Sequence, residues 1–191
     1  MANSVSGFAL ALAFSLASVM AAYLNRHAAA LVSALNTFIQ SVSVLVWSIV
    51  LIMVFGVSSR LPPVLVTAAA CYPVLLSATL GGVQALDEKF SELARMLGAS
   101  RLQEFVYFIL PGTVPYITSA SRAAVGLALR ISVVAEAFGA SGGIGYQLVY
   151  SYDMGLREGV FAWGLLLIAL MILIDYAVLR PVERWAQRWR L

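Results

Sequence analysis

The chain has 191 residues, of which 62% are hydrophobic and only 11% are charged, with a net charge of +3. A soluble globular domain usually carries roughly 45–50% apolar and about 25% charged residues, so a soluble enzyme is excluded. Disorder and coiled coil need abundant polar residues and are excluded as well. The composition predicts a polytopic membrane protein, and the continuous apolar runs predict an all-α bundle, because backbone groups in lipid must be satisfied within their own segment.

Five apolar segments are long enough to cross a bilayer. A hydrocarbon core about 30 Å thick needs roughly 20 residues of helix. The segments that meet this length are, in chain order, Val5–Leu24, Leu35–Phe55, Leu61–Val83, Val114–Phe138 and Val160–Leu179. Residues 1–191 are predicted to form a single transmembrane domain. The start of the chain lacks the basic region of a secretory signal, so its first apolar run is predicted to be retained.

The basic residues predict which side of the membrane each loop faces. Five spans place the termini on opposite sides, and a cytoplasmic C-terminus leaves only Arg60 and Arg157 in the outer segments. The inner segments then hold Arg26, Lys89, Arg95, Arg101, Arg180, Arg184, Arg188 and Arg190. Because cytoplasmic loops carry an excess of Lys and Arg, the N-terminus is predicted outside and the C-terminus inside. Residues 180–191, with Trp185 and Trp189, are predicted to be a basic tail on the inner leaflet.

This chain lacks the residues that several functional classes require. It has one lysine, one cysteine (Cys71) and one histidine (His27), which excludes a basic nucleic-acid-binding face, an internal disulfide and a histidine metal cluster. It also has no paired-carboxylate constellation, nucleophile–base set or Walker A motif. Gly142, Gly143 and Gly145 are predicted to form a flexible outer turn. We therefore expect no catalytic residue, metal or cofactor on this chain.

The polar stretch between the third and fourth spans, residues 86–111, has the most informative pattern. Apolar residues at helical spacing predict one stripe on a short helix, formed by Leu86, Phe90, Leu93 and Leu97. Gly98 follows where a helix end favours a left-handed residue, and Ser100 with Gln103 predicts a capping box for a second helix. Pro111 is predicted to interrupt that helix. From the residues alone, the stripe docks equally well on the membrane, a neighbouring span or a partner protein.

The spacing of this loop resembles a known motif. Glu92, Leu93 and Ala94 are followed after three residues by Gly98, and after nine more by Phe108–Pro111. This order is similar to the EAA loop of the permeases of binding-protein-dependent ABC importers. Leu93 stands in place of the first alanine and Phe108 in place of the isoleucine, and both replacements are apolar.

The resemblance continues to the C-terminus. Arg122, Val133–Ser141 and Gly143–Tyr146 are similar to the nitrate, sulfonate and taurine branch of these permeases, as is the ending with Asp175 and the basic tail. Most members of that branch carry an additional N-terminal span, whereas this chain starts almost at the first core helix. The sequence leaves open whether that helix is lost or supplied by another subunit.

The resemblance implies a transmembrane importer subunit in the bacterial inner (plasma) membrane. Such a subunit pairs with a second copy or a related permease and receives a small solute from an extracytoplasmic binding protein. Its loop inserts into a groove on a cytoplasmic ATPase dimer, which holds the ATP and Mg²⁺. The residues implied in this coupling are Glu92, Leu93, Ala94, Leu97, Gly98, Leu110 and Pro111.

Polar residues inside the spans are the candidates for the pathway. A charge in mid-bilayer costs about 2.5–3.5 kcal/mol on insertion scales. Arg130 either pairs with a carboxylate such as Asp175, which we favour, or faces the pathway and meets an anionic solute. Arg122, near the inner end of its span, is expected to snorkel. The other pathway candidates are Ser43, Trp47 and Glu136, the last with helix packing as its favoured role.

Two rival functions remain beside the importer subunit. A non-transport membrane scaffold has no need of the coupling loop and tolerates a bulky residue at Gly98. An intramembrane enzyme is disfavoured because the sequence contains no nucleophile–base or metal set.

Overall fold

All the elements that can be placed in this chain are helical. The computed structural model describes residues 2–56, 59–86, 88–139, 142–179 and 181. The elements are α1 (Ala2–Leu24), α2 (Arg26–Ser41), α3 (Val44–Phe55), α4 (Leu61–Ala85), α5 (Glu88–Met96), α6 (Arg101–Glu104), the π-helix η1 (Phe105–Ile109), α7 (Leu110–Gly139), α8 (Ile144–Asp153), α9 (Arg157–Ile174) and the π-helix η2 (Asp175–Leu179). The described residues contain no strand, so the prediction of an all-α bundle is confirmed.

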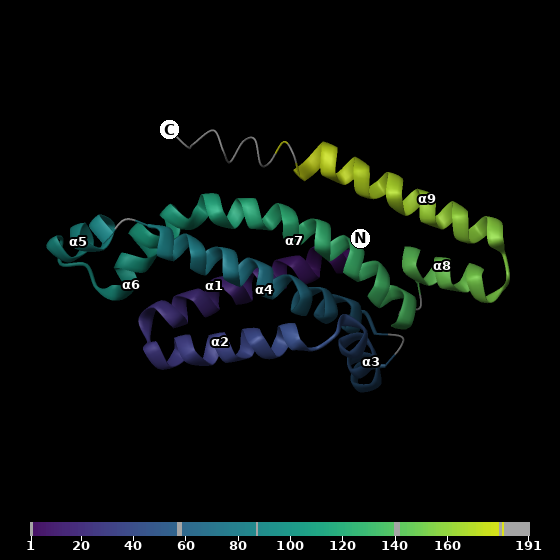
Figure 1. Ribbon diagram of the computed structural model, residues 1–191, viewed down its shortest axis with the longest axis horizontal. Helices are drawn as coiled ribbons and strands as arrows, with labels where there is room; N and C mark the ends of the chain where they lie inside the picture. Colours follow the sequence, from purple (N-terminus) through teal and green to yellow (C-terminus); the bar gives the residue numbers. More distant parts are fainter. Residues whose placement is uncertain (1, 57–58, 87, 140–141, 180, 182–191) are drawn as a thin grey trace.

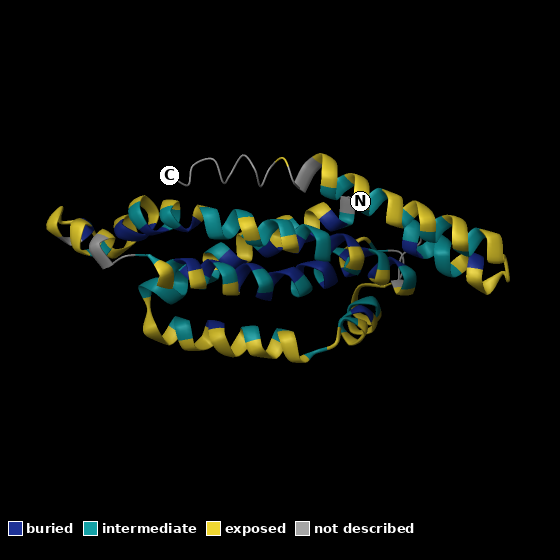
Figure 2. Cartoon of the chain, turned by 45° about the horizontal axis from the view of Figure 1, so that its top comes forward, coloured by how far each residue is buried: buried dark blue, intermediate teal, exposed yellow. Residues whose placement is uncertain are grey.

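Three helices, α1, α4 and α7, pack together at the centre of the bundle (Figure 1). Their contact surfaces use small side chains, and Ala11, Cys71, Ala124 and Ala128 are almost completely buried. Helices in lipid gain little from covering one another's apolar groups, so close packing of small residues is a main source of their association. Figure 2 shows the buried residues gathered in these central helices, while the outer helices are largely exposed.

The predicted number of spans agrees with the structure when one bent pair is counted as a single span. Four helical stretches are long and apolar enough to cross a membrane: Asn3–Leu24, Leu61–Ala85, Arg101–Phe138 and Arg157–Ala177. They correspond to the first, third, fourth and fifth predicted spans. The polytopic architecture is therefore confirmed.

The second predicted span, Leu35–Phe55, is wrong as a continuous helix. Helices α2 and α3 meet at 96°, and Val42 and Ser43 between them are extended. The Ser43 hydroxyl accepts a hydrogen bond from the backbone N–H of Leu45 and thereby caps α3. A serine that bonds to nearby backbone favours the start of a new helix over continuation of the old one, and the apolar pattern does not record this.

The inner segment predicted around Arg26 is also helical rather than a loop. Helix α2 begins at Arg26, and the Asn25 side chain accepts a hydrogen bond from the N–H of His27 at 2.9 Å. His27 is exposed in the first turn. An N-cap asparagine satisfies a backbone donor that would otherwise be free, so the helix can start immediately after α1.

The two ends of the bundle carry different elements. Figure 1 shows the α1–α2 turn and the α5–α6 segment at one end, with α3 and α8 toward the other. This matches the predicted grouping of segments, although which end is cytoplasmic stays a prediction. The predicted basic tail, with Arg180, Arg184, Trp185, Arg188, Trp189 and Arg190, lies outside the described residues, as do Asp87 in the loop and Ala140 and Ser141 in the outer turn.

The interruption predicted at Pro111 does not occur. The helix runs from Arg101 to Phe138 without a break. Immediately before the proline it widens into the π-helix η1, where the N–H of Leu110 bonds to the carbonyl of Phe105. Proline cannot supply the N–H that an α-helical register requires, and a π-turn shifts that register by one residue. The wider turn therefore allows the helix to continue through Pro111.

The outer turn after α7 is shorter than predicted, because Gly145 lies inside α8. A Cβ at Gly145 would collide with the carbonyl oxygen of Val133 on α7, so the glycine allows the two backbones to touch. Gly143, with φ +124°, supplies the turn itself. The glycines thus serve both the turn and the packing of a helix that hydropathy did not predict.

Replacing Gly145 with alanine should separate α8 from α7. Overpacking of a tight contact costs about 1–3 kcal/mol, and here the obstacle is backbone that cannot rotate away. Gly164→Ala is the matched control, because nothing lies within 4 Å of a Cβ at that helical position. We expect thermal unfolding in detergent to show a lower Tm for Gly145→Ala, and an equal or higher Tm for Gly164→Ala. Equal effects of the two substitutions would contradict the close contact.

Candidate functional site

Helix α5 lies at one end of the bundle (Figure 1), where it presents an exposed apolar surface. Four of its neighbouring side chains are exposed, by 44% for Phe90, 48% for Leu93, 83% for Met96 and 69% for Leu97. We call these four residues the loop surface. The sequence predicted Leu86 in the same stripe, but Leu86 packs against the core instead, and a Cβ on Gly112 would meet its Cδ2 at 2.7 Å. Met96 was not predicted.

The turn after α5 has the predicted geometry. Gly98 adopts φ +69°, the left-handed conformation that glycine reaches without strain. The N–H of Ala99 bonds to the carbonyl of Ala94 at 3.0 Å, which closes the end of the helix. The capping box is also present: the Ser100 hydroxyl accepts from the N–H of Gln103, and the Gln103 side chain accepts from the N–H of Ser100. Both ends of the turn are therefore fixed by local hydrogen bonds.

The predicted coupling residues divide between the surface and the interior. The side chains of Glu92, Leu93 and Leu97 are exposed, and so is Gly98. Ala94 is completely buried where α5 meets η1 and α6. Leu110 packs partly against the core, and Pro111 is exposed at the start of α7. The first group can meet a partner, whereas Ala94 and Leu110 can only hold the loop in place.

Asp175 pairs with Arg122, which corrects the favoured pairing of Asp175 with Arg130. The Nη2 of Arg122 donates to Oδ1 of Asp175 at 3.3 Å, between α7 and the C-terminal end of α9. Arg122 therefore has an ion pair where the sequence predicted snorkelling. Arg130 is exposed and makes no hydrogen bond or ion pair with the part of the chain that the structure describes. The sequence contained both arginines but could not tell which of them α9 reaches.

Glu136 is buried, at 4% exposure, and ties three segments together. Its Oε1 accepts from Nδ2 of Asn3 on α1 and from Oγ of Ser132 on α7, both at 3.4 Å. Its Oε2 lies against Gly143, where an added Cβ would collide with it. This carboxylate sits beside the N-terminal end of α8, whose partial positive charge favours an anion. The favoured packing role of Glu136 thus agrees with its position, and its partner Asn3 had no signal in the sequence.

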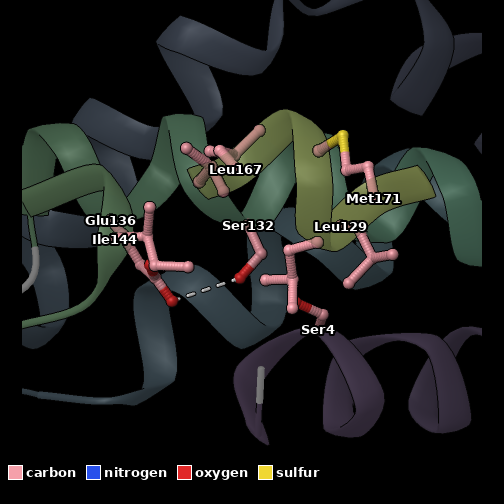
Figure 3. A pocket seen from close by; sticks show the side chains of 9 residues that line it. Ser4, Leu129, Ser132, Glu136, Ile144, Leu167 and Met171 are labelled. Carbon is pink, nitrogen blue, oxygen red and sulfur yellow. Dashed lines mark hydrogen bonds between the residues drawn. The ribbon is translucent and has the colours of Figure 1, made fainter. Parts of the chain in front are cut away.

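A small cavity adjoins this carboxylate. Figure 3 shows Ser4, Ser132 and Glu136 around it, with Leu167 and Met171 of α9 on another side. Its volume is about 20 Å³, and a polar cavity above roughly 10–15 Å³ can hold one water molecule. The cavity is too small for a solute, so in this conformation it belongs to the packing of α1, α7 and α9.

Ser43 and Trp47, the other pathway candidates, lie at the bend between α2 and α3. Ser43 is exposed and caps α3. Trp47 is half-buried and packs edge-on against Phe38, with ring centroids 6.3 Å apart. No group of three potential metal-ligating side chains occurs among the described residues. The structure thus places the pathway candidates apart from one another, on α3 and on α7.

The chain is similar to known transport proteins over most of its length. A family model described as "Binding-protein-dependent transport system inner membrane component" matches residues 13–185. The taurine transport system permease of Escherichia coli is 32% identical over 71% of this chain and 48% of the relative. The bicarbonate transport system permease of Synechococcus elongatus is 25% identical over 97% of this chain and 65% of the relative. A nitrate import permease of the same species is 31% identical over 61% and 42%, respectively.

The chain spans about half the length of the curated relatives it matches. Its fold resembles the crystal structure of an amino acid ABC transporter, with a TM-score of 0.75 over 95% of this chain and 88% of that one. The two sequences are 17% identical, so this likeness concerns the fold alone.

Removing Arg122 should destabilise the chain more than removing Arg130. Arg122→Ala leaves Asp175 without this guanidinium partner, and the loss of such a charged hydrogen bond costs about 1–3 kcal/mol. Arg130→Ala removes no hydrogen bond or ion pair within the described residues, so its Tm in detergent should match the wild type or exceed it. The opposite order of Tm values would contradict the assignment of the pair.

Proposed function

The chain belongs to the binding-protein-dependent transport system inner membrane component family, and we propose that it is the transmembrane subunit of an ATP-binding-cassette importer. In this role its helices form the translocation pathway for a small solute. The single observation that carries the proposal is the loop surface, an exposed apolar face on a helix with a fixed turn, within a chain of this family.

The loop surface is proposed to dock in a groove on a cytoplasmic ATPase dimer. Three large apolar side chains stand in solvent on a helix of only nine residues, and a fourth, Leu97, follows directly after it. Fully burying an exposed side chain of this kind stabilises a complex by roughly 1.5–3 kcal/mol before the costs of association. Exposed Glu92 beside them adds a charged edge that orients the contact. Because α5 lies between α4 and α7 in the chain, movement of the ATPase reaches both central helices.

The other partners follow from the same proposal. Since the sequence has no Walker A motif, ATP, Mg²⁺ and hydrolysis belong to the ATPase subunits. A second copy of the chain or a related permease completes the pathway, and an extracytoplasmic binding protein delivers the solute. The family is an inner membrane component, and the arginine distribution supports an outer N-terminus and a cytoplasmic C-terminus.

Substitution of Gly98 by arginine should uncouple the ATPase. A Cβ strains the turn at φ +69°, and the guanidinium enters the apolar loop surface. In reconstituted membranes the solute-stimulated ATPase rate should fall to the basal rate, and the nucleotide-binding subunit should be lost from a mild-detergent pull-down. Gly155→Arg is the matched control, because Gly155 has φ +70° and an equally open surrounding outside the loop.

The non-transport scaffold predicts a different result. A scaffold inserts and folds with Gly98→Arg as it does with Gly155→Arg, and no nucleotide-binding subunit accompanies either variant. If Gly98→Arg kept wild-type solute stimulation, the coupling role of the loop would be wrong.

Arg130 is proposed to bind an anionic group of the solute. The neighbouring Leu129 and Ser132 line a cavity with Leu167 and Met171, so Arg130 lies level with the middle of the apolar α9. An unpartnered arginine facing lipid at that depth is costly, whereas a water-filled pathway and an anion satisfy it. Taurine, nitrate and bicarbonate, which the names of the relatives mention, all carry an anionic group.

Arg130→Gln should raise the KM for such an anion. Uptake of labelled taurine, nitrate or bicarbonate into proteoliposomes identifies the probe that the wild type transports. Loss of one charge-assisted hydrogen bond should then raise its KM about tenfold or more, with a smaller change for Arg130→Lys. Arg157→Gln, at an exposed arginine that begins α9, is the control. Equal KM values for Arg130→Gln and the wild type would refute this role.

A further inference from the structure

Helix α2 has an exposed polar face as well as an exposed apolar one. Ser33, Thr37 and Gln40 are exposed and follow one another at spacings of four and three residues, so they share one side of the helix. We call them the polar sector of α2. The exposed apolar residues Leu31, Leu35 and Phe38 lie on the opposite side, because 100° per residue separates the two sets by about half a turn.

With α2 and α3 counted as one bent span, the polar sector lies at membrane depth. Helix α2 starts at the turn after Asn25, and a rise of 1.5 Å per residue places Ser33 to Gln40 roughly 12–22 Å above that turn. A hydrocarbon core is about 30 Å thick. These side chains therefore stand at depths where acyl chains offer no hydrogen bonds.

Only part of the polar sector has hydrogen-bond partners among the described residues. The Thr37 hydroxyl donates to the carbonyl of Ser33 at 3.0 Å, a bond within the helix. The Gln40 amide has two donors and an acceptor, and it makes no hydrogen bond with the described residues. An amide in this position requires water or a polar partner.

The break between α2 and α3 also requires water or a surrounding protein partner. Val42 and Ser43 leave the helical conformation next to the polar sector, and Ser41 and Ser43 are exposed there. Non-helical backbone at membrane depth is tolerated only where it is buried in protein or lines a water-filled cavity. The backbone of the break and the side chains of the polar sector are thus both accounted for by a water-filled cavity beside α2.

We propose that the polar sector of α2 lines the water-filled pathway, with Leu31, Leu35 and Phe38 facing lipid. The proposal rests on the proposed importer function and assigns the pathway to a particular side of α2. It extends the pathway surface from the bend at Ser43 to the helix before it. The hydroxyls and the amide offer both donors and acceptors to hydrated solutes in transit.

Thiol accessibility tests the assignment, and the chain offers a favourable background. Its single cysteine, Cys71, is completely buried, with its Sγ 3.3 Å from the carbonyl oxygen of Ala124. Ser33→Cys, Thr37→Cys and Gln40→Cys are compared with Leu31→Cys, Leu35→Cys and Phe38→Cys in the assembled transporter in membrane vesicles. The probe is a membrane-impermeant methanethiosulfonate that carries a sulfonate, applied without nucleotide and in an ATP-trapped state.

The polar-sector cysteines should react at least about tenfold faster than the apolar set in one of the two states, because a thiolate forms only in water. Wild type should stay unlabelled. Labelling of both sets at equal rates, or of neither set in either state, would overturn the proposal; the second result means that a protein partner covers the polar sector. Since labelling needs no transport, this outcome is independent of whether Gly98→Arg uncouples the ATPase.

Discussion

The close approach of α1, α4 and α7 is the contact on which the rest of the structure depends. A Cβ at Gly7 of α1 would lie 2.8 Å from the carbonyl oxygen of Val64, and one at Gly82 of α4 would lie 3.0 Å from Tyr116 on α7. A Cβ at Gly7 would overlap the backbone of α4, and one at Gly82 would force Tyr116 to shift, so these glycines set how closely the helices approach. Helices α2, α3 and α8 and the π-helix η1 contact this trio directly, while α5 and α6 pack against η1 and α9 packs against α8.

The central trio also explains how a loop of short helices can act at a distance. The segment with α5 and α6 connects α4 to α7, and Leu86 fills the space beside Gly112 at its base. Helix α7 then runs to the far end, where Glu136 meets Asn3 of α1. A displacement of the loop is therefore transmitted by two stiff helices rather than by flexible connections. The proposed importer function requires such a path between the loop surface and the opposite end of the bundle.

The sequence predicted the features that depend on neighbouring residues. Apolar run length gave the spans, and glycine chemistry gave the turn at Gly98, since a left-handed helix end and a Ser-Gln capping box are local events. The 96° bend, the π-turn before Pro111 and helix α8 were missed. In each case a capping serine, a shifted hydrogen-bond register or a close backbone contact decided the outcome, and none of these changes hydropathy.

Some charged side chains of the spans have partners among the described residues, and others do not. Arg122 forms an ion pair with Asp175. Glu136 accepts hydrogen bonds from the neutral side chains of Asn3 and Ser132. Both positions were visible in the sequence, but their partners come from other helices and could only be guessed. Arg130 and Gln40 make no such contact within the described residues. Because polar groups at membrane depth require partners, the surfaces that carry these two residues are complete only with water, a solute or another subunit. Within the described residues some membrane-embedded polar groups are satisfied and others are not, and this arrangement agrees with the proposed place of the chain as one wall of a shared pathway.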